Sequence, residues 1–238
     1  GFETESEYLR YRCCFTDSPG ISNEELLELK NDVTYCKKWI EEHSKMLMIA
    51  VAAVVLIVLG VILANNYICK PKAIEASNEN AKANVYFAQG EWEKALNGDD
   101  NECIGFEAIA NEYKLYQQGK LAALYAGVCY YKLGDYENAK TMLSKFSASD
   151  LMIDPAANIL LGDTYVQLQD YAKAVKAFEA AAASKNELLA PISLKKAGFV
   201  YLEMGNKSAA KKVFETIKND YPQAQEAQDI DKYIVIAQ

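Results

Sequence analysis

Few residues of this chain could do chemistry. Among its 238 residues there is one histidine, His43, so a Ser-His-Asp or Cys-His arrangement would have to be built on that residue alone. His43 lies between Glu42 and Ser44, directly before a long apolar run, and we expect it to be solvated. Neither a GxxxxGK(S/T) phosphate loop nor a GxGxxG fingerprint occurs, and the carboxylates are scattered over presumed helix surfaces. The sequence therefore predicts that the protein is not an enzyme.

The cysteines do not form a metal-binding pattern. No CxxC pair occurs, and a single histidine cannot complete a zinc site with them. We therefore expect neither a metal nor another cofactor. We expect Cys129 to be a small core residue. If residues 70–238 are periplasmic, a disulfide at Cys69 or Cys103 is compatible with the compartment, but the spacing does not require one. The six cysteines are Cys13, Cys14, Cys36, Cys69, Cys103 and Cys129.

The stretch Asn97-Gly98-Asp99-Asp100-Asn101 is acidic enough to suggest a Ca²⁺ site. It lacks the ligand spacing and the closing glutamate of an EF-hand loop, so we interpret it as a solvated loop. The net charge is −8, and no arginine follows residue 12. Nucleic acid is a poor candidate partner for such a chain, because its recognition depends on phosphate neutralisation and bidentate arginine contacts.

An internal repeat in the sequence predicts the helices of this protein. Three stretches share small residues, a tyrosine three positions later, a turn and a second apolar set. The turn positions are 134, 169 and 205, so the steps are 35 and 36 residues. Each unit is predicted to fold as helix, tight turn and helix, with Gly134, Gln169 and Gly205 where the first helix stops. The predicted packing positions are Gly127, Tyr130, Ala139, Leu143, Gly162, Tyr165, Ala174, Phe178, Gly198, Tyr201, Ala210 and Phe214.

Further elements flank these three units. Tyr86, Gly90 and Trp92, followed by residues 105–113, predict a fourth unit upstream, which the loop of about seven residues from Asn97 to Cys103 splits. Residues 225–238 are predicted to form a helix that covers the last apolar face, as repeat arrays require. We expect Pro155 and Pro191 at the first positions of their helices, with Asp154 as a helix cap. The predicted units span residues 76–116, 120–153, 155–189 and 191–224, within a domain of residues 73–238.

The nineteen residues from Met46 to Ala64 are all apolar, and no charge occurs between Lys45 and Lys70. At 1.5 Å per residue this run spans a bilayer core. A signal peptide is disfavoured because about 45 residues precede it, and an amphipathic core helix is disfavoured because the run is uniformly apolar. We therefore predict a transmembrane helix over residues 46–68. Four lysines precede it within twenty residues and three follow within twenty, which weakly favours a cytoplasmic N-terminus.

The residues before this run divide into two parts. Leucine and other apolar residues recur at steps of three to four from Leu26 to Ile40, with Ser22 and Glu25 as a capping box, so residues 23–45 are predicted to form a juxtamembrane helix. Trp39 would lie near the headgroups. Residues 1–22 show no period, and we expect a tail whose origin and order the sequence does not determine.

The repeat pattern resembles the tetratricopeptide repeat. This resemblance implies an all-α tetratricopeptide-repeat α-solenoid of about four units plus a capping helix, with one N-terminal transmembrane helix. By the same resemblance the first helix of each unit lines a concave groove that binds proteins. The predicted groove residues are Phe87, Leu124, Val128, Tyr131, Ile159, Val166, Lys195, Phe199 and Leu202. Because this lining is apolar and poor in charge, it does not resemble a clamp for acidic peptides.

The anchor and repeats together resemble the YfgM-like ancillary subunits of the Sec translocon, in particular those of Bacteroidetes. The stretches that carry this resemblance are residues 95–99, 104–106, 191–198 and 221–234. It implies a bacterial inner-membrane protein with a cytoplasmic N-terminus and periplasmic repeats. The implied partners are translocon subunits, periplasmic chaperones and nascent envelope proteins. The leading hypothesis is a non-catalytic adaptor, and the alternative is a self-assembling structural subunit of an envelope complex for outer-membrane assembly or motility, which could be a homo-oligomer.

Overall fold

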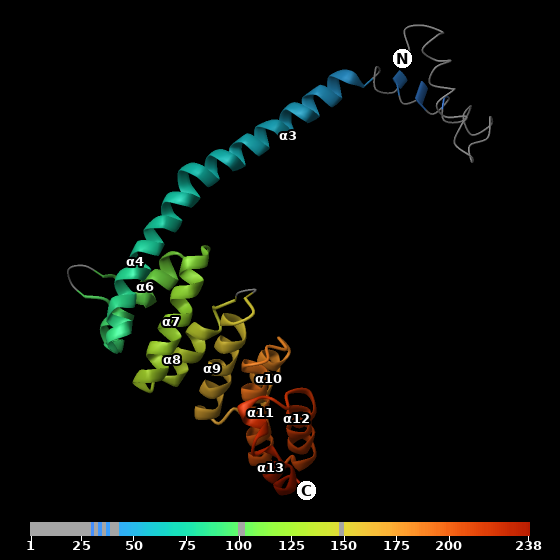
Figure 1. Ribbon diagram of the computed structural model, residues 1–238. Coiled ribbons are helices and arrows are strands. Elements are labelled where there is room, and N and C mark those ends of the chain that lie inside the picture. Colours follow the sequence, from blue (N-terminus) through green and yellow to red (C-terminus); the bar gives the residue numbers. More distant parts are fainter. Residues whose placement is uncertain (1–29, 31–32, 35–36, 39–42, 100–102, 148–149) are drawn as a thin grey trace. The chain divides into compact units, whose positions relative to one another are not determined.

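The computed structural model describes residues 30, 33–34, 37–38, 43–99, 103–147 and 150–238. The chain divides into two compact units, residues 1–66 and 67–238, which we describe separately (Figure 1). The predicted tail and most of the predicted juxtamembrane helix lie outside the described residues. Within this predicted helix, the described residues 30, 33–34 and 37–38 are helical.

The first unit contains α3, Ser44–Ala64. Wherever the burial of its side chains is described, they are exposed, including Leu56 at 69% and Ile49 at 71%. By length and composition this helix is long and apolar enough to cross a membrane. A π-helical turn, η1 (Asn65–Cys69), follows it along the chain.

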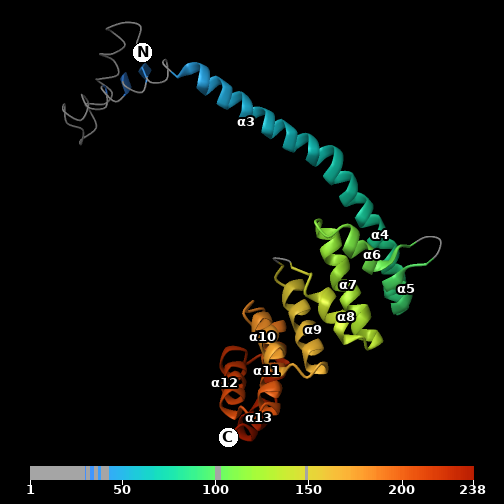
Figure 2. The same ribbon diagram turned by 180° about the vertical axis from the view of Figure 1, so that it is seen from behind.

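The second unit is entirely helical over its described residues, apart from one isolated bridge between Asp99 and Cys103 that closes the loop in the split repeat. Its helices pack in chain order, each pair joined by a tight turn packing against the next pair (Figures 1 and 2). The elements are α4 (Lys70–Gln89), α5 (Trp92–Asn97), α6 (Gly105–Glu112), α7 (Gln117–Leu133), α8 (Tyr136–Leu143), α9 (Ile153–Gln167), α10 (Tyr171–Ala182), α11 (Leu189–Glu203), α12 (Lys207–Asp220), η2 (Gln225–Ala227) and α13 (Ile230–Ile236).

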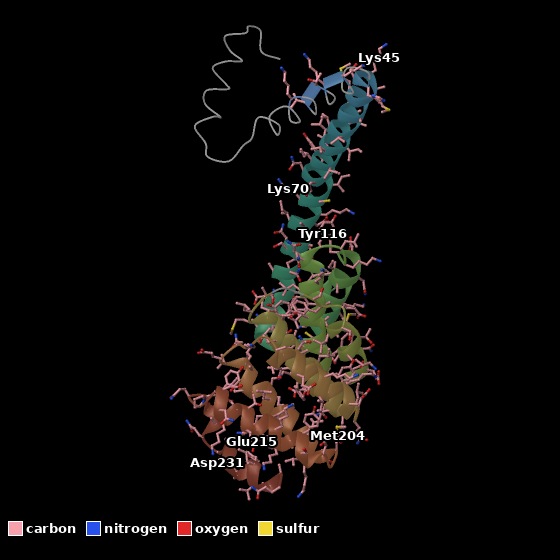
Figure 3. All side chains as sticks on the ribbon, turned by 90° about the vertical axis from the view of Figure 1, so that its right-hand side faces the viewer. Lys45, Lys70, Tyr116, Met204, Glu215 and Asp231 are labelled. Atoms are coloured by element: carbon pink, nitrogen blue, oxygen red, sulfur yellow. The ribbon has the colours of Figure 1, made fainter. Side chains whose placement is uncertain are left out.

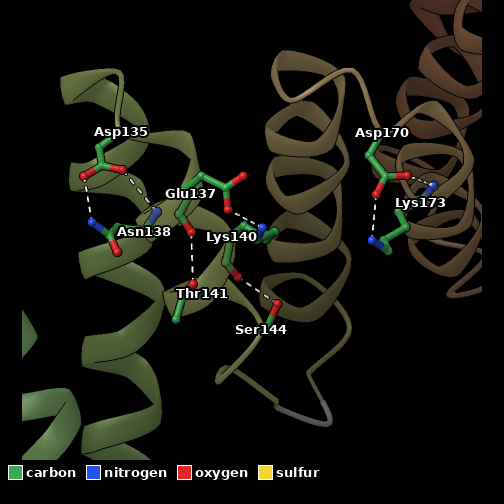
Figure 4. A network of polar contacts seen from close by, with 8 residues as sticks. All are labelled: Asp135, Glu137, Asn138, Lys140, Thr141, Ser144, Asp170 and Lys173. Carbon is green, nitrogen blue, oxygen red and sulfur yellow. Dashed lines mark hydrogen bonds and ion pairs between the residues drawn. The ribbon is translucent and has the colours of Figure 1, made fainter.

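One local design makes the turn within each unit. Gly134 adopts a left-handed φ of 83°, and its N–H donates to the Tyr131 carbonyl while the next N–H donates to the Tyr130 carbonyl. Asp135 then caps α8, because its carboxylate accepts from the N–H of Asn138 at 3.1 Å (Figure 4). The same two devices recur with Asp170 before α10 and Asn206 before α12. Stop and start signals in adjacent residues therefore fix each of these hairpins.

The second of these turns carries a strained residue. Gln169 occupies the left-handed position with φ 59°, where Gly134 and Gly205 stand in the neighbouring units. A residue that has a Cβ atom is less stable by about 1–2 kcal/mol in this conformation than in the right-handed helical one. We expect Gln169→Gly to raise the free energy of unfolding by about 0.5–1 kcal/mol, since the greater backbone entropy of unfolded glycine offsets part of the relief. Urea denaturation followed by circular dichroism measures this change.

The control for this prediction is Ala156→Gly, at an exposed position inside α9. It should lower the free energy of unfolding by about 1 kcal/mol, because glycine is a poor helix residue. Equal destabilisation by both variants would contradict the strain at residue 169.

In each of the last three units, a buried glycine of the first helix faces a large side chain of the second helix. A Cβ at Gly127 would lie 2.6 Å from Cγ of Leu143, at Gly162 2.5 Å from Cε1 of Phe178 and at Gly198 2.2 Å from Cε1 of Phe214. No wider residue therefore fits at these positions without displacing its neighbour. Ala139, Ala174 and Ala210 are fully buried in the facing helices. The paired helices thus approach closely where a glycine contacts a leucine side chain or a phenylalanine ring.

Two helix starts differ from the sequence prediction. Pro155 and Pro191 are not the first residues of their helices, because α9 begins at Ile153 and α11 at Leu189. The cap of α9 is Asp150 and not Asp154: its carboxylate accepts from the N–H groups of Met152 and Ile153, each at 2.8 Å. The Asn186 side chain does the same at the start of α11. Proline is tolerated at the third position because the first four N–H groups of a helix have no partner within it.

The predicted capping helix over residues 225–238 is divided. A short 3₁₀ turn, η2, precedes α13, and the break falls at Gln228 and Asp229. The Asp229 carboxylate forms ion pairs with Lys195 and Lys232, each at 2.7 Å. Ile230 is 1% exposed and packs with Leu194, Phe214 and Ile217. The end of the array is therefore covered by a short helix, which the buried Ile230 and the ion pairs Lys195–Asp229 and Lys218–Asp231 connect to α11 and α12.

Candidate protein-binding surface

The first helices of units 2, 3 and 4 are neighbours, since α7 contacts α9 and α9 contacts α11. We call the side chains predicted for the groove on these three helices the A-helix face. On α7 and α9 all of them are half-buried, so they offer apolar surface without belonging to the interior. These residues are Leu124, Val128, Tyr131, Ile159 and Val166.

A polar line crosses the same face. The Tyr131 hydroxyl lies near Asp163 and hydrogen-bonds Gln167, and burial raises the pKa of this tyrosine. Asp163 in turn accepts from the Lys196 ammonium at 2.7 Å, which ties α9 to α11. These contacts hold the three helices in register. They neutralise Asp163, so the face carries little net charge between its apolar side chains.

In unit 4 the A-helix face contacts the end helix α13, although Phe199 stays 40% exposed. The Phe199 ring makes an edge contact with Tyr233 of α13, with centroids 4.9 Å apart. Lys195 pairs with Asp229 and lies over the Tyr233 ring at 5.3 Å, and Leu202 packs against the same cluster. The hydrogen bonds from Lys195 and Lys232 lower the pKa of Asp229 to about 2, so this anchor stays charged at neutral pH. Among the described residues, η2 and α13 contact only α11, α12 and each other.

Phe87, the predicted groove residue of unit 1, belongs to an aromatic cluster. Its ring lies 5.2 Å from Trp92, 5.1 Å from Tyr125 and 6.0 Å from Phe106, measured between centroids. The fully buried Phe106 stacks on Tyr125. Phe87 therefore fixes α4 against α5 and α7. Ile159 and Val166 of α9 pack against the core cluster around Phe178, whereas Leu124 and Val128 of α7 belong to no such cluster.

The sequence analysis missed a set of ties between successive units. The Tyr130 hydroxyl donates to Glu107 at 2.7 Å, and the Tyr201 hydroxyl donates to Glu179 at 2.7 Å. Burial, followed by this hydrogen bond, raises the pKa of Tyr201 to about 12. Tyr165 lacks the equivalent glutamate, because Ser144 occupies the matching position and donates to the Lys140 carbonyl. The available signal was the glutamate that directly follows each buried phenylalanine, Phe106 and Phe178.

The described residues offer little for catalysis. Cys69 is exposed, whereas Cys103 and Cys129 are buried, and all three are thiols. Burial raises the pKa of Cys129 to about 12, so it is not a nucleophile at neutral pH. Over the described part of the chain, no three acidic, histidine or cysteine side chains gather as metal ligands would. The Asp99 carboxylate, suggested above for a Ca²⁺ loop, accepts from the N–H of Cys103 and contacts the Tyr86 hydroxyl.

Two protein-family models match the helical hairpins of the repeat domain. One model of the tetratricopeptide repeat matches residues 155–187, and a second matches residues 121–149 and 194–224. These are the hairpins α7–α8, α9–α10 and α11–α12. Residues 121–224 thus form a tetratricopeptide-repeat array. Such arrays mediate protein–protein interaction and are generally non-catalytic, and no catalytic domain is identified in the chain.

Comparison with solved structures gives the same fold. A structure titled "Crystal structure of MamA protein" is 18% identical, with a TM-score of 0.51, and the match covers 68% of this chain and 85% of that one. Another, titled "Crystal structure of MamA", is 18% identical with a TM-score of 0.49, covering 65% and 91%. At this identity the likeness extends to the fold alone. None of the curated proteins compared with this chain matches it.

Proposed function

We propose that the protein is a membrane-anchored adaptor whose tetratricopeptide repeats bind apolar segments of partner proteins on the A-helix face of α7 and α9. The observation that carries the proposal is a set of half-buried apolar side chains on two neighbouring first helices, α7 and α9. These side chains are Leu124, Val128, Ile159 and Val166, and the end helix α13 contacts α12 and η2 and not α7 or α9. Apolar side chains held at a repeat surface by a rigid scaffold are typical of protein-binding sites.

The anchor in this proposal is α3, with the N-terminus in the cytoplasm and the repeats in the periplasm of a bacterium. The apolar length of the helix and the excess of lysines before it support this topology. The resemblance to YfgM-like proteins supports partners at the Sec translocon, including its subunits, periplasmic chaperones and nascent envelope proteins.

A second candidate function is self-assembly, as a structural subunit of an envelope complex. It is favoured by two exposed side chains on α13, Val235 at 64% and Ile236 at 55%. They lie at the end of the array, where a second copy could continue the stacking of helices.

The test is photo-crosslinking of the full-length protein in cells, with a photoreactive residue at Leu124 or Val128. Thr141, exposed on α8, is the control position. We expect both A-helix positions to crosslink other proteins, including translocon subunits, and the control to give at least tenfold less. Crosslinks only between copies of the chain would favour self-assembly. Equal yields at all three positions would contradict the proposed binding face.

A further inference from the structure

The two edges of the repeat domain differ in how far their apolar side chains are exposed. The turns within units form one edge, where Asp135, Asp170 and Asn206 cap the second helices and where Leu133 and Met204 are 41% and 46% exposed. The loops between units form the other edge, and each presents a highly exposed leucine. These are Leu115, 85% exposed, Leu151, 74% exposed, and Leu188, 60% exposed. We call these three side chains the leucine edge.

The leucine edge repeats with the units. Leu115 stands two residues before α7, Leu151 two before α9 and Leu188 one before α11. Packing within the array does not require these side chains, because each is exposed more than half. Two further apolar side chains extend the row at its centre, Met152 at 48% and Ile153 at 42%. An apolar residue retained in three successive loops at the same edge indicates one extended surface that contacts all of them.

The chain enters the repeat domain at this same edge. The Asn80 amide donates to the Gln118 carbonyl at 3.0 Å, and Phe87 meets Tyr125 seven residues further along both helices, so α4 and α7 run parallel. Their N-terminal ends therefore share an edge. Figure 3 shows Lys70 and Tyr116 near each other at the N-terminal end of the repeat domain.

The distance along α4 is short. Tyr113 hydrogen-bonds Glu75, so the loop that carries Leu115 lies beside Glu75. Five residues of helix separate Glu75 from Lys70, which is about 7.5 Å at the helical rise of 1.5 Å per residue. The leucine edge therefore begins about 7.5 Å along α4 from Lys70, the first residue of this helix.

The loops have the composition of segments that lie in a membrane interface. Two of the leucines have an exposed lysine close by in the same loop, Lys114 beside Leu115 and Lys185 three residues before Leu188. The lysine in the third loop, Lys145, donates to Asn111 and Met142. A lysine can extend its ammonium to the headgroups while a neighbouring leucine enters the acyl region. Acidic residues occur in the same loops, with Asp150 and Glu187 exposed, so charge alone does not attract this edge to a membrane.

We propose that the leucine edge inserts into the surface of the lipid bilayer and holds the repeats along the membrane. The occupant is the bilayer itself, bound by apolar insertion of Leu115, Leu151 and Leu188. This inference rests on the proposed anchoring by α3, and it adds a second attachment that fixes how the repeat domain is presented. The A-helix face would then stand at a defined height above the lipid surface.

The experiment is lipid photo-crosslinking of the full-length protein in phosphatidylcholine vesicles. A diazirine amino acid is placed in turn at Leu115, Leu151 or Leu188, and lipid adducts are counted by mass spectrometry. Met204, 46% exposed at the opposite edge, is the matched control, and Leu56 in α3 reports the anchor. We expect strong lipid adducts at Leu56, and adducts at the three leucine-edge positions at least tenfold above those at Met204.

The outcomes separate the two proposals. Adducts at Leu56 without an excess at the leucine edge overturn the insertion and leave the anchor standing. Absence of adducts at Leu56 overturns the anchor and, with it, the insertion that depends on it. Crosslinks from the leucine edge to protein in place of lipid, or adducts that require anionic lipid, also overturn the proposal, because they would indicate a protein contact or binding by charge.

Discussion

Replacing Phe178 with alanine should lower the free energy of unfolding of the repeat domain by about 3–5 kcal/mol. The side chain is 1% exposed and packs with Ala174, Val175, Ala197 and Val200. Its ring also fills the space left by Gly162, where even a Cβ would lie 2.5 Å away. Glycine has no side chain that could move into the vacated volume. The lost ring would therefore leave a cavity between α9, α10 and α11.

Urea denaturation of residues 67–238, followed by far-UV circular dichroism, measures this loss. The control is Phe199→Ala, in which the same ring is removed from a side chain that is 40% exposed. That change should cost about 1 kcal/mol, since it removes edge contacts with Tyr233 and Phe214 without opening the core. Equal losses of unfolding free energy in the two variants would show that the contact between Gly162 and Phe178 is not what stabilises the packing of α9 on α10.

The core cluster around Phe178 also supports the binding face, because Ile159 and Val166 of α9 pack against it. Val128 on α7 is half-buried and does not belong to that cluster. Val128→Asp should therefore weaken partner binding without disturbing the packing around Phe178.

How much the sequence revealed depends on the range of the interactions involved. The all-α repeat fold was predictable, because its signals are local: a residue in the left-handed conformation at 134, a cap at 135 and alanine at 139 act within a few positions. The starts of α9 and α11 were misplaced because the caps, Asp150 and Asn186, lie further upstream than the prolines suggested. Proline allows several positions in the first turn, so it does not fix the start.

Longer-range features could not be derived from spacing. The hydrogen bond from Tyr130 to Glu107 joins residues 23 positions apart, and the Phe199 ring contacts Tyr233 of the end helix. Both depend on the rotation between successive helix pairs, which a repeat period does not specify. The leucine edge was equally hidden. A leucine before a helix is compatible with a buried or an exposed side chain, and only the fold distinguishes Leu151 in a loop from Leu143 in the core.

Replacing Ile230 with aspartate should release α13 and lower the free energy of unfolding by about 3–5 kcal/mol. Ile230 is 1% exposed and packs on Phe214 and Ile217. A carboxylate there would be desolvated without a partner, and both this penalty and the lost apolar contact oppose docking. The matched control is Val235→Asp in the same helix, because Val235 is 64% exposed and the change should cost less than about 0.5 kcal/mol.

Two further measurements show whether release of α13, and not unfolding of the whole array, causes the loss. Burial raises the pKa of the introduced carboxyl in the docked state, so it stays neutral more readily there. Relative to the parent protein, the loss of unfolding free energy in Ile230→Asp should therefore shrink as the pH falls toward 4 and grow as it rises above that value.

Release of α13 would also uncover Phe199, Lys195 and the apolar side of α12. Light scattering should then detect association of the Ile230→Asp protein at concentrations where Val235→Asp stays unchanged, because an array without its end helix exposes its core. A variant that lost stability equally at all pH values and remained unassociated would contradict the role of Ile230 as the anchor of the cap.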